Sequence, residues 1–189
     1  MNDNQPDRTP DDSRGLLRWI AETAGLIALA FLLAMTIRAT VAEAFQVPTG
    51  SMEPTIMSFD RIIAEKITPH FEGPNVGEVV VIKNPTGGTT PFVKRVVALP
   101  GQTVDVKDGG VYVDGKRLNE GYTHGLPSEP LSLTLPITVP ADDVWVMGDN
   151  RTNSGDSRIF GPVPISTIIG RAVCVYWPLQ HVASLVGGQ

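Results

Sequence analysis

Ser51 lies on a stretch of chain whose backbone is constrained on both sides. Pro48 and Pro54 restrict the flanking backbone, and Gly50 permits geometry that other residues resist, so Ser51 is held on a stiff turn. A serine hydroxyl held in this way is a candidate nucleophile for acyl transfer. The alternative is a proline-rich linker, because serine beside glycine is common in ordinary loops.

Lys94 occurs in the segment FVKRVVA, which has the pattern of a β-strand over residues 92–98. Side chains alternate along a strand, so this lysine would share one face with Phe92, Val96 and Ala98. Apolar surroundings disfavour an ammonium, and a pKa three units below about 10.4 would correspond to about 4 kcal/mol. A neutral lysine is a competent general base. The alternative is an edge-strand lysine that prevents aggregation, the commoner role of a strand lysine.

A third candidate is the dense polar loop within VWVMGDNRTNSGDSR, at residues 144–158. It offers two carboxylates and two guanidiniums, enough for a mutually paired scaffold formed by Asp149, Arg151, Asp156 and Arg158. Such a scaffold would fix Ser154 and Ser157, whose hydroxyls are suited to orient a neutral lysine. The alternative is a solvated hairpin loop, because Gly, Asp, Asn and Ser are ordinary turn formers.

The composition argues against several other kinds of chemistry. The chain of 189 residues has 15 basic and 20 acidic residues, a net charge of −5 and no basic stripe, which argues against a nucleic-acid partner. The one cysteine, Cys174, has no partner for an internal disulfide, and the three histidines are too scattered for a zinc-ligand spacing. We therefore expect no metal, no other cofactor and no nucleic acid.

An apolar segment precedes these candidates. Residues 23–37 carry no charge, and extension to Leu16 gives 22 residues, or about 33 Å of helix, close to the thickness of a hydrocarbon core. Arginines at positions 8, 14 and 18 precede the segment, and only Arg38 stands in the 20 residues after it, which predicts a cytoplasmic N-terminus. We predict a disordered cytoplasmic tail at 1–15, one transmembrane helix at 16–38 and an extracytoplasmic domain at 39–189.

Two other interpretations of this segment stay open. Basic residues, an apolar run and then Ala42-Glu43-Ala44 also fit a signal peptide cleaved before Phe45, although 22 residues is long for its apolar core. A buried helix of a soluble protein is the second alternative, although no polar face recurs along the run. The anchor and the cleaved signal both export the domain that follows.

From residue 45 onward, short apolar runs alternate with turn residues. The expected strands are 61–67, 78–83, 92–98, 103–106, 111–113, 131–135, 144–147 and 168–176. Asp108-Gly109-Gly110 and Asp114-Gly115 are hairpin turn signals, and strands do not alternate with helices. We predict one mainly β domain of antiparallel sheets, with exposed loops at 73–77, 85–91 and 119–130.

The three motifs, in this order and behind an apolar segment, resemble bacterial type I signal peptidase, a family of Ser/Lys serine proteases. FQVPTGSMEPT is similar to the family's nucleophile motif, FVKRVVALPG to its lysine motif, and GDNRTNSGDSR, followed by GPVP and GRA, to its C-terminal signature. The resemblance extends from Phe45 to Pro178. It implies two large antiparallel β-sheets that carry the site near the membrane surface. It also implies removal of signal peptides from exported preproteins at bonds that follow small residues.

The resemblance also implies roles for individual residues. Ser51 would be the nucleophile, Lys94 the general base, and Ser154 would orient the lysine amine. The oxyanion hole would combine the Ser51 N–H with the hydroxyl of Thr49, where many members have serine; the extra methyl group restricts the rotamer. The structural ion-pair cluster would contain Arg95, Asp149, Asp156 and Arg158, and the substrate pockets would be lined by Phe45, Val47, Pro48, Ile56 and Val93.

The implied partners are signal peptides and membrane lipid, and we expect a monomer with one span in the cytoplasmic membrane, whereas some members have two spans. A first rival is a membrane-anchored β-domain that binds exported partners without catalysis, which leaves Lys94 and the polar loop unexplained. A second rival is a self-cleaving Ser/Lys repressor of related fold. That protein should carry a DNA-binding helical domain where this chain has its apolar segment.

Overall fold

The computed structural model describes residues 12–187, and its first unit is the helix α1 (Asp12–Thr40). The stretch Gly15–Ile37 has a mean hydropathy of 2.1 and is long and apolar enough to cross a membrane. Its large side chains stay exposed, with Leu26 at 69% and Phe31 at 67%. A helix that is apolar on all sides suits lipid rather than water. Of the predicted tail, residues 1–11 lie outside the described part of the chain, and 12–15 are helical.

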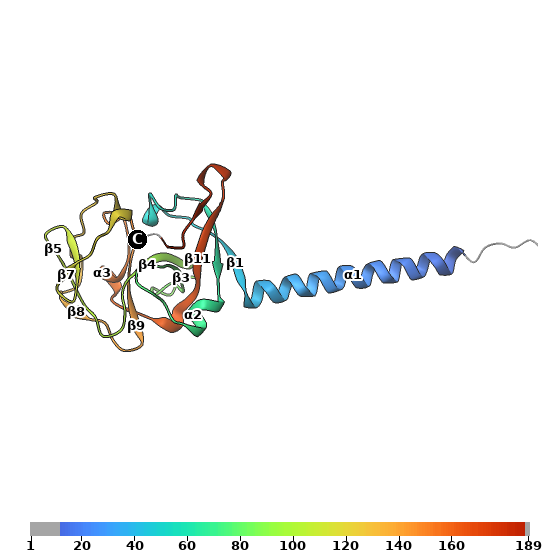
Figure 1. The fold of residues 1–189 in the computed structure, drawn as a ribbon, viewed down its shortest axis with the longest axis horizontal. Helices are drawn as coiled ribbons and strands as arrows, with labels where there is room; N and C mark the ends of the chain where they lie inside the picture. Colours follow the sequence, from blue (N-terminus) through green and yellow to red (C-terminus); the bar gives the residue numbers. More distant parts are fainter. Residues whose placement is uncertain (1–11, 188–189) are drawn as a thin grey trace, which may run out of the picture. The chain divides into compact units, whose positions relative to one another are not determined.

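The second unit is built on a large antiparallel sheet that carries both candidate chemical residues. Within the described residues it has eight strands in the order β1-β2-β11-β3-β4-β9-β10, with β12 paired to β11 (Figure 1). The strands are β1 (Ala42–Gln46), β2 (Arg61–Glu65), β3 (Val79–Ile82), β4 (Phe92–Ala98), β9 (Asp143–Met147), β10 (Val163–Pro164), β11 (Ile168–Trp177) and β12 (Ala183–Ser184). The central strands are nearly continuous apolar runs because both of their faces are buried.

A smaller antiparallel sheet follows the large one. Its order is β7-β6-β5-β8, and Figure 1 shows it at the side of the domain away from β1. The strands are β5 (Thr103–Lys107), β6 (Gly110–Val113), β7 (Lys116–Arg117) and β8 (Ile137–Thr138). Both hairpin turns have positive φ at two successive residues, 50° and 68° at Asp108-Gly109 and 51° and 76° at Asp114-Gly115. Such turns match the right-handed twist of the flanking strands. The prediction of a mainly β domain with two antiparallel sheets is confirmed.

Short helices interrupt the strands at six places. They are η1 (Gly50–Met52), α2 (Ile67–Phe71), η2 (Gly121–Thr123), α3 (Ser157–Phe160), η3 (Ile165–Thr167) and η4 (Leu179–His181), counted over residues 41–187. The predicted strand 61–67 is too long, because the Glu65 carboxylate accepts the N–H groups of Ile67 and Thr68, each at 2.9 Å, and so begins α2.

The predicted strand 131–135 is wrong. Its side chains alternate between exposed and half-buried as in a strand, but its backbone joins neither sheet. The N–H of Ser132 instead donates to the carbonyl of Arg158. Leu133 and Leu135 pack against the core of the small sheet, so the alternating pattern reports burial without strand pairing.

The two faces of β4 join different cores. Val96 and Phe92 belong to a cluster with Val80 and Val146. Val93 packs in a second cluster with the segment that carries Ser51. Phe92 and Val96 share a face with Lys94 as predicted, but Ala98 does not. The register between β4 and β9 shifts between Val96 and Ala98, and Ala98 packs in the core of the small sheet.

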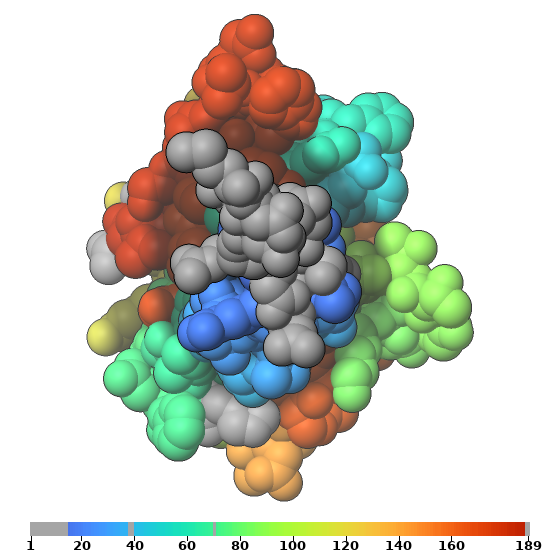
Figure 2. Space-filling model, turned by 90° about the vertical axis from the view of Figure 1, so that its right-hand side faces the viewer, coloured from blue at the N-terminus to red at the C-terminus, as the bar shows by residue number. Residues whose placement is uncertain are grey.

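The three predicted loops differ in exposure. Residues 85–90 are exposed, and Figure 2 shows them as the light green lobe at the surface of the domain. In the loop 73–77, Asn75 and Val76 are exposed, Gly73 and Gly77 are half-buried, and Pro74 is buried. The loop 119–130 is not simply exposed, because Thr123 and Ser128 are buried in it.

Candidate active site

The Ser51 turn is the short helix η1, which follows the extended residue Thr49. Met52 and Ile56, which follow Ser51, are fully buried in the same apolar cluster as Val47, which precedes it. This cluster anchors the turn from both sides. Ser51 is 8% exposed. A Cβ on Gly50 would stand 2.7 Å from the Glu53 carboxylate, which would have to move aside.

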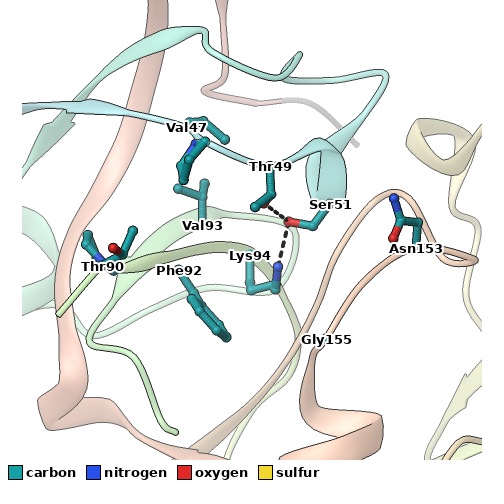
Figure 3. Close-up of a pocket in the computed structure, with 11 residues that line it drawn as sticks. Val47, Thr49, Ser51, Thr90, Phe92, Val93, Lys94, Asn153 and Gly155 are labelled. Carbon is teal, nitrogen blue, oxygen red and sulfur yellow. Dashed lines mark hydrogen bonds between the residues drawn. The ribbon is translucent and has the colours of Figure 1, made fainter. Parts of the chain in front are cut away.

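Lys94 contacts Ser51 from the strand β4. It lies in the middle of β4, opposite Val80 of β3, and is 3% exposed. Its Nζ is 2.7 Å from Ser51 Oγ (Figure 3). Burial lowers the pKa of Lys94 to about 8, while the charges of Asp156 and Asp149 oppose the shift. A general base needs both this contact and a pKa near the working pH.

Thr49 also points toward the Ser51 hydroxyl. Its Oγ1 donates to Ser51 Oγ at 3.5 Å, a long hydrogen bond drawn in Figure 3. The Ser51 N–H stands in the first turn of η1, where backbone N–H groups have no intrahelical acceptor. Two donors are therefore available beside the nucleophile.

Ser154 makes no hydrogen bond to Lys94. Its Oγ is buried and meets the geometry of a hydrogen bond with no atom of the described residues, although it is close enough to Asp156 to help lower the pKa of that carboxyl. The hydroxyl would be 2.3 Å from a Cβ on Gly148, so it packs against that glycine. This structure therefore shows no direct hydrogen bond by which Ser154 would orient the Lys94 amine.

The four predicted ion-pair residues form two separate pairs. Arg95 donates to both oxygens of Asp149, at 2.8 and 2.6 Å, and Arg158 to both oxygens of Asp156, at 2.9 and 2.8 Å. All four side chains are 3% exposed or less. Burial alone would raise the pKa of Asp156, but the hydrogen bonds and charge of Arg158 outweigh it, so the pKa lies below its usual value.

A cavity of about 450 Å³ opens beside Ser51 and Lys94. Of the predicted pocket residues, Val47, Pro48 and Val93 line it, whereas Ile56 is fully buried in the core and Phe45 packs against that core. In Figure 3, Val47 and Val93 lie side by side and Asn153 stands on the other side of Ser51. The lining residues that the sequence did not indicate are Thr90, Pro91, Phe92, Asn153 and Gly155.

Ser51 and the buried Lys94 are thus in contact beside a cavity. A sequence model described as "Signal peptidase, peptidase S26" matches residues 18–177 of this chain. The chain belongs to the signal peptidase family.

Relatives of this signal peptidase cover most of its length. A probable signal peptidase I-1 of Synechocystis sp. is 41% identical over 172 residues, 87% of this chain and 86% of that protein. A signal peptidase I of Leptolyngbya laminosa is 42% identical over 167 residues, 84% of this chain and 80% of that protein. A crystal structure of a signal peptidase I from Enterococcus faecalis matches with a TM-score of 0.44 and 30% identity, over 52% of this chain and 95% of that one. The chain is an enzyme that removes signal peptides.

Two residues of the signal peptidase site drew no attention in the sequence because they are uncharged. Asn150 holds the Ser51 turn at two points, since its N–H donates to the Ser51 carbonyl at 3.1 Å and its side chain to the Gly50 carbonyl at 3.0 Å. Gly148 lies against the same turn, where a Cβ would be 2.3 Å from the Ser51 carbonyl oxygen. Both residues lie in the GDN sequence directly after β9. This position at the end of a strand was the signal that could have marked them.

Metal ligands do not gather in this signal peptidase. Among the side chains that the structure describes, no group of three or more His, Cys, Asp or Glu residues is placed to hold a metal ion. His181 pairs with Asp60 at 2.7 Å, and Cys174 stands by itself on β11.

Proposed function

We propose that this signal peptidase cleaves preproteins by acyl transfer, with Ser51 as the nucleophile and Lys94 as the general base. The observation that carries the proposal is the 2.7 Å contact between Lys94 Nζ and Ser51 Oγ beside a cavity of about 450 Å³. A lysine with a pKa near 8 has a sizeable neutral fraction at neutral pH, and only that fraction can accept the serine proton.

The chemical steps follow from these two side chains. Lys94 Nζ takes the Ser51 proton while Oγ bonds to the scissile carbonyl carbon. The ammonium then gives the proton to the leaving amine as the peptide C–N bond breaks, which leaves an ester on Ser51. Water then attacks the ester carbon while Lys94 Nζ accepts a proton from the water. The bond from this carbon to Ser51 Oγ breaks, Oγ takes a proton back from Lys94, and the carboxylic acid is released. The Ser51 N–H and the Thr49 hydroxyl stabilise the negative charge on the former carbonyl oxygen, both when the ester forms and when it is hydrolysed.

The cavity favours substrates with small residues before the cleaved bond. Val47 and Val93 narrow it beside Ser51, so a large side chain next to the scissile bond would collide with them. Apolar pockets of limited size discriminate by exclusion. A signal peptide that ends in a small-x-small pattern fits this cavity. The substrate is expected to bind extended, as an added strand.

The helix α1 supports a place in the membrane. Its exposed apolar stretch Gly15–Ile37 is long enough for one span, and we place the N-terminus in the cytoplasm and the β-domain outside, because arginines precede the span. We assign the enzyme to the cytoplasmic membrane as a monomer, with residues 16–38 in the lipid and 39–189 outside. Anchoring confines enzyme and substrate to one surface and raises their effective concentration.

The test is cleavage of a preprotein by the purified full chain in detergent. Ser51→Ala removes the nucleophile and is expected to abolish cleavage, whereas Ser132→Ala, which removes an exposed serine, should leave it unchanged. A second pair compares Lys94→Ala with Lys83→Ala, an exposed lysine at the end of β3. Cleavage by Ser51→Ala at the rate of the unaltered chain would refute Ser51 as the nucleophile, whereas no cleavage by the unaltered chain would favour a domain that only binds exported partners.

A further inference from the structure

The loop 119–130 connects the small sheet to the active site. Glu120, Tyr122 and Ser128 contact buried arginines, although the sequence pattern predicts only an exposed loop. We call residues 119–130 the strap. None of its residues touches Ser51 or Lys94, and none was marked by the motifs.

The first contact of the strap is with Arg151, whose side chain is fully buried. Glu120 accepts two hydrogen bonds from this guanidinium, at 2.9 and 2.6 Å, and the Ser128 hydroxyl accepts a third at 2.7 Å. The Nε of Arg151 donates to the Gly148 carbonyl at 2.9 Å. A buried guanidinium in this position needs its partners, because an unpaired buried charge is strongly destabilising.

The second contact is made by Tyr122, whose ring lies against two guanidiniums. The centre of its ring is 4.0 Å from Cζ of Arg95 and 5.8 Å from Cζ of Arg151. Its hydroxyl donates to Glu120 at 2.9 Å. Burial raises the pKa of Tyr122, and the charge of Glu120 adds to this, so the ring stays neutral and can stack on both cations.

These two arginines lead directly to the nucleophile and its base. Arg151 holds Gly148, whose backbone packs against the Ser51 carbonyl. Arg95 holds Asp149, which accepts a hydrogen bond from Thr55, close to Ser51 in the sequence. The charged groups that act on Lys94 are Asp149, Asp156 and Arg158, so the strap reaches the first of them through Arg95.

We propose that Glu120 and Tyr122 are positioning residues, which fix the loop 148–153 through Arg151 and Arg95 and so hold the Ser51 turn and the surroundings of Lys94 in their reactive geometry. This inference rests on the proposed Ser51 and Lys94 chemistry. It gives the small sheet a part in catalysis without any contact to substrate.

The physical consequence of removing Tyr122 has a definite sign. Without the ring, water reaches the Arg95 and Asp149 pair, and the Arg95 guanidinium is less firmly held. The positive charge of Arg95 then offsets the negative charge of Asp149 less well, so Asp149 acts more strongly on Lys94. Both the added water and the freer carboxylate favour the ammonium form of Lys94, so its pKa rises. The rate should then need a higher pH, and the displaced Ser51 turn should lower kcat more than it changes KM.

The experiment measures kcat, KM and the pH profile of preprotein cleavage for the full chain in detergent. Tyr122→Leu is expected to lower kcat by about 10- to 100-fold and to move the acid limb to higher pH, with KM changed much less. Tyr122→Phe keeps the stacked ring and should retain most of the rate. The matched control is Tyr112→Leu, because Tyr112 also stacks on a cation, Lys107 at 5.0 Å, but lies on β6 and is not part of the strap.

A merely structural role gives a different result. Loss of folded protein lowers the amount of active enzyme and leaves the pH midpoint where it was, so an unchanged midpoint in Tyr122→Leu overturns the proposal, as does an unchanged kcat. If Tyr122→Leu does not fold, the same readouts on Glu120→Gln decide, since this change weakens only the bonds to Arg151 and Tyr122. Inactivity of Ser51→Ala together with a normal Tyr122→Leu removes the inference and keeps the proposed function.

Discussion

In the proposed mechanism, the protonation state of Lys94 controls whether Ser51 can react. The amine is surrounded by protein, and burial is the largest cause of its lowered pKa. Carboxylates of Asp156 and Asp149 act in the opposite direction, which keeps the pKa at about 8 rather than lower. The site is therefore a balance between lost hydration and nearby negative charge.

This balance predicts the pH dependence of the enzyme. Because the neutral amine is the active form, kcat/KM should rise with pH through a midpoint near 8 and fall off below it. Lys94→Arg keeps a positive charge but should be inactive, since a guanidinium is not deprotonated in proteins. Rates of preprotein cleavage from pH 5 to 11 in roughly half-unit steps give the midpoint. A flat profile down to pH 5, or an active Lys94→Arg, would contradict the assignment.

A second prediction at the residue scale concerns Thr49. Its hydroxyl already points toward Ser51 Oγ, beside which the oxygen of the attacked carbonyl would develop charge. Thr49→Val keeps the shape and removes the donor, so kcat should fall by about 10²- to 10³-fold with less effect on KM. Thr49→Ser should stay active. If Thr49→Val cleaves at the normal rate, the second donor is another group.

At the scale of elements, the buried pair Arg95 and Asp149 joins β4 to the loop that follows β9. The pair connects residues 54 positions apart, and the same carboxylate takes the Thr55 hydroxyl at 2.6 Å. It therefore fixes the base strand, the polar loop and the chain after η1 at a single point. Removal of one partner leaves the other charge buried without compensation.

The expected result for Asp149→Asn is a loss of about 3 to 5 kcal/mol in the free energy of unfolding. Urea unfolding of the full chain in detergent, followed by tryptophan fluorescence, measures it. Asp105→Asn is the matched control, because Asp105 pairs with the half-exposed Lys107 and its loss should change the midpoint little. Equal midpoints for the two variants would show that the buried pair does not hold these elements together.

At the scale of the whole molecule, the strand β1 bears on the fate of the N-terminal helix. The cleavage-like Ala42-Glu43-Ala44 lies in β1, which pairs with β2 from Ala42 opposite Glu65 to Gln46 opposite Arg61. Glu43 also forms an ion pair with Lys66 at 2.7 Å. A peptidase binds its substrate as a free extended strand, and this strand is already paired.

We therefore predict that α1 stays attached to the β-domain. Protein extracted from membranes at native expression should have the intact mass of the full chain and should resist alkaline carbonate extraction. The pairing of β1 with β2 is the physical reason, because cleavage before Phe45 requires this strand to leave the sheet. N-terminal sequencing that finds mainly chains beginning at Phe45 would show a cleaved signal instead.

Local signals in the sequence determined several features without help from the rest of the fold. The strand 92–98 has the predicted bounds, since its run of β-branched residues between Pro91 and Leu99 is read locally. The turn Asp114-Gly115 has the positive φ values that its residue types allow. Residue type and immediate neighbours made Ser51 and Lys94 candidates, and the resemblance of three motifs in order implied their roles.

Contacts between distant segments were decided only by the tertiary structure. Arg95 pairs with Asp149 of the loop after β9, although the sequence also offers it Asp156 in the same loop. Ile56 fills the core rather than the cavity, and the strap residue Glu120 reaches Arg151 across 31 positions. Residue type fixes which pairs are chemically possible, but only the packing of the sheets brings particular partners within hydrogen-bond distance, and that packing depends on all strands at once.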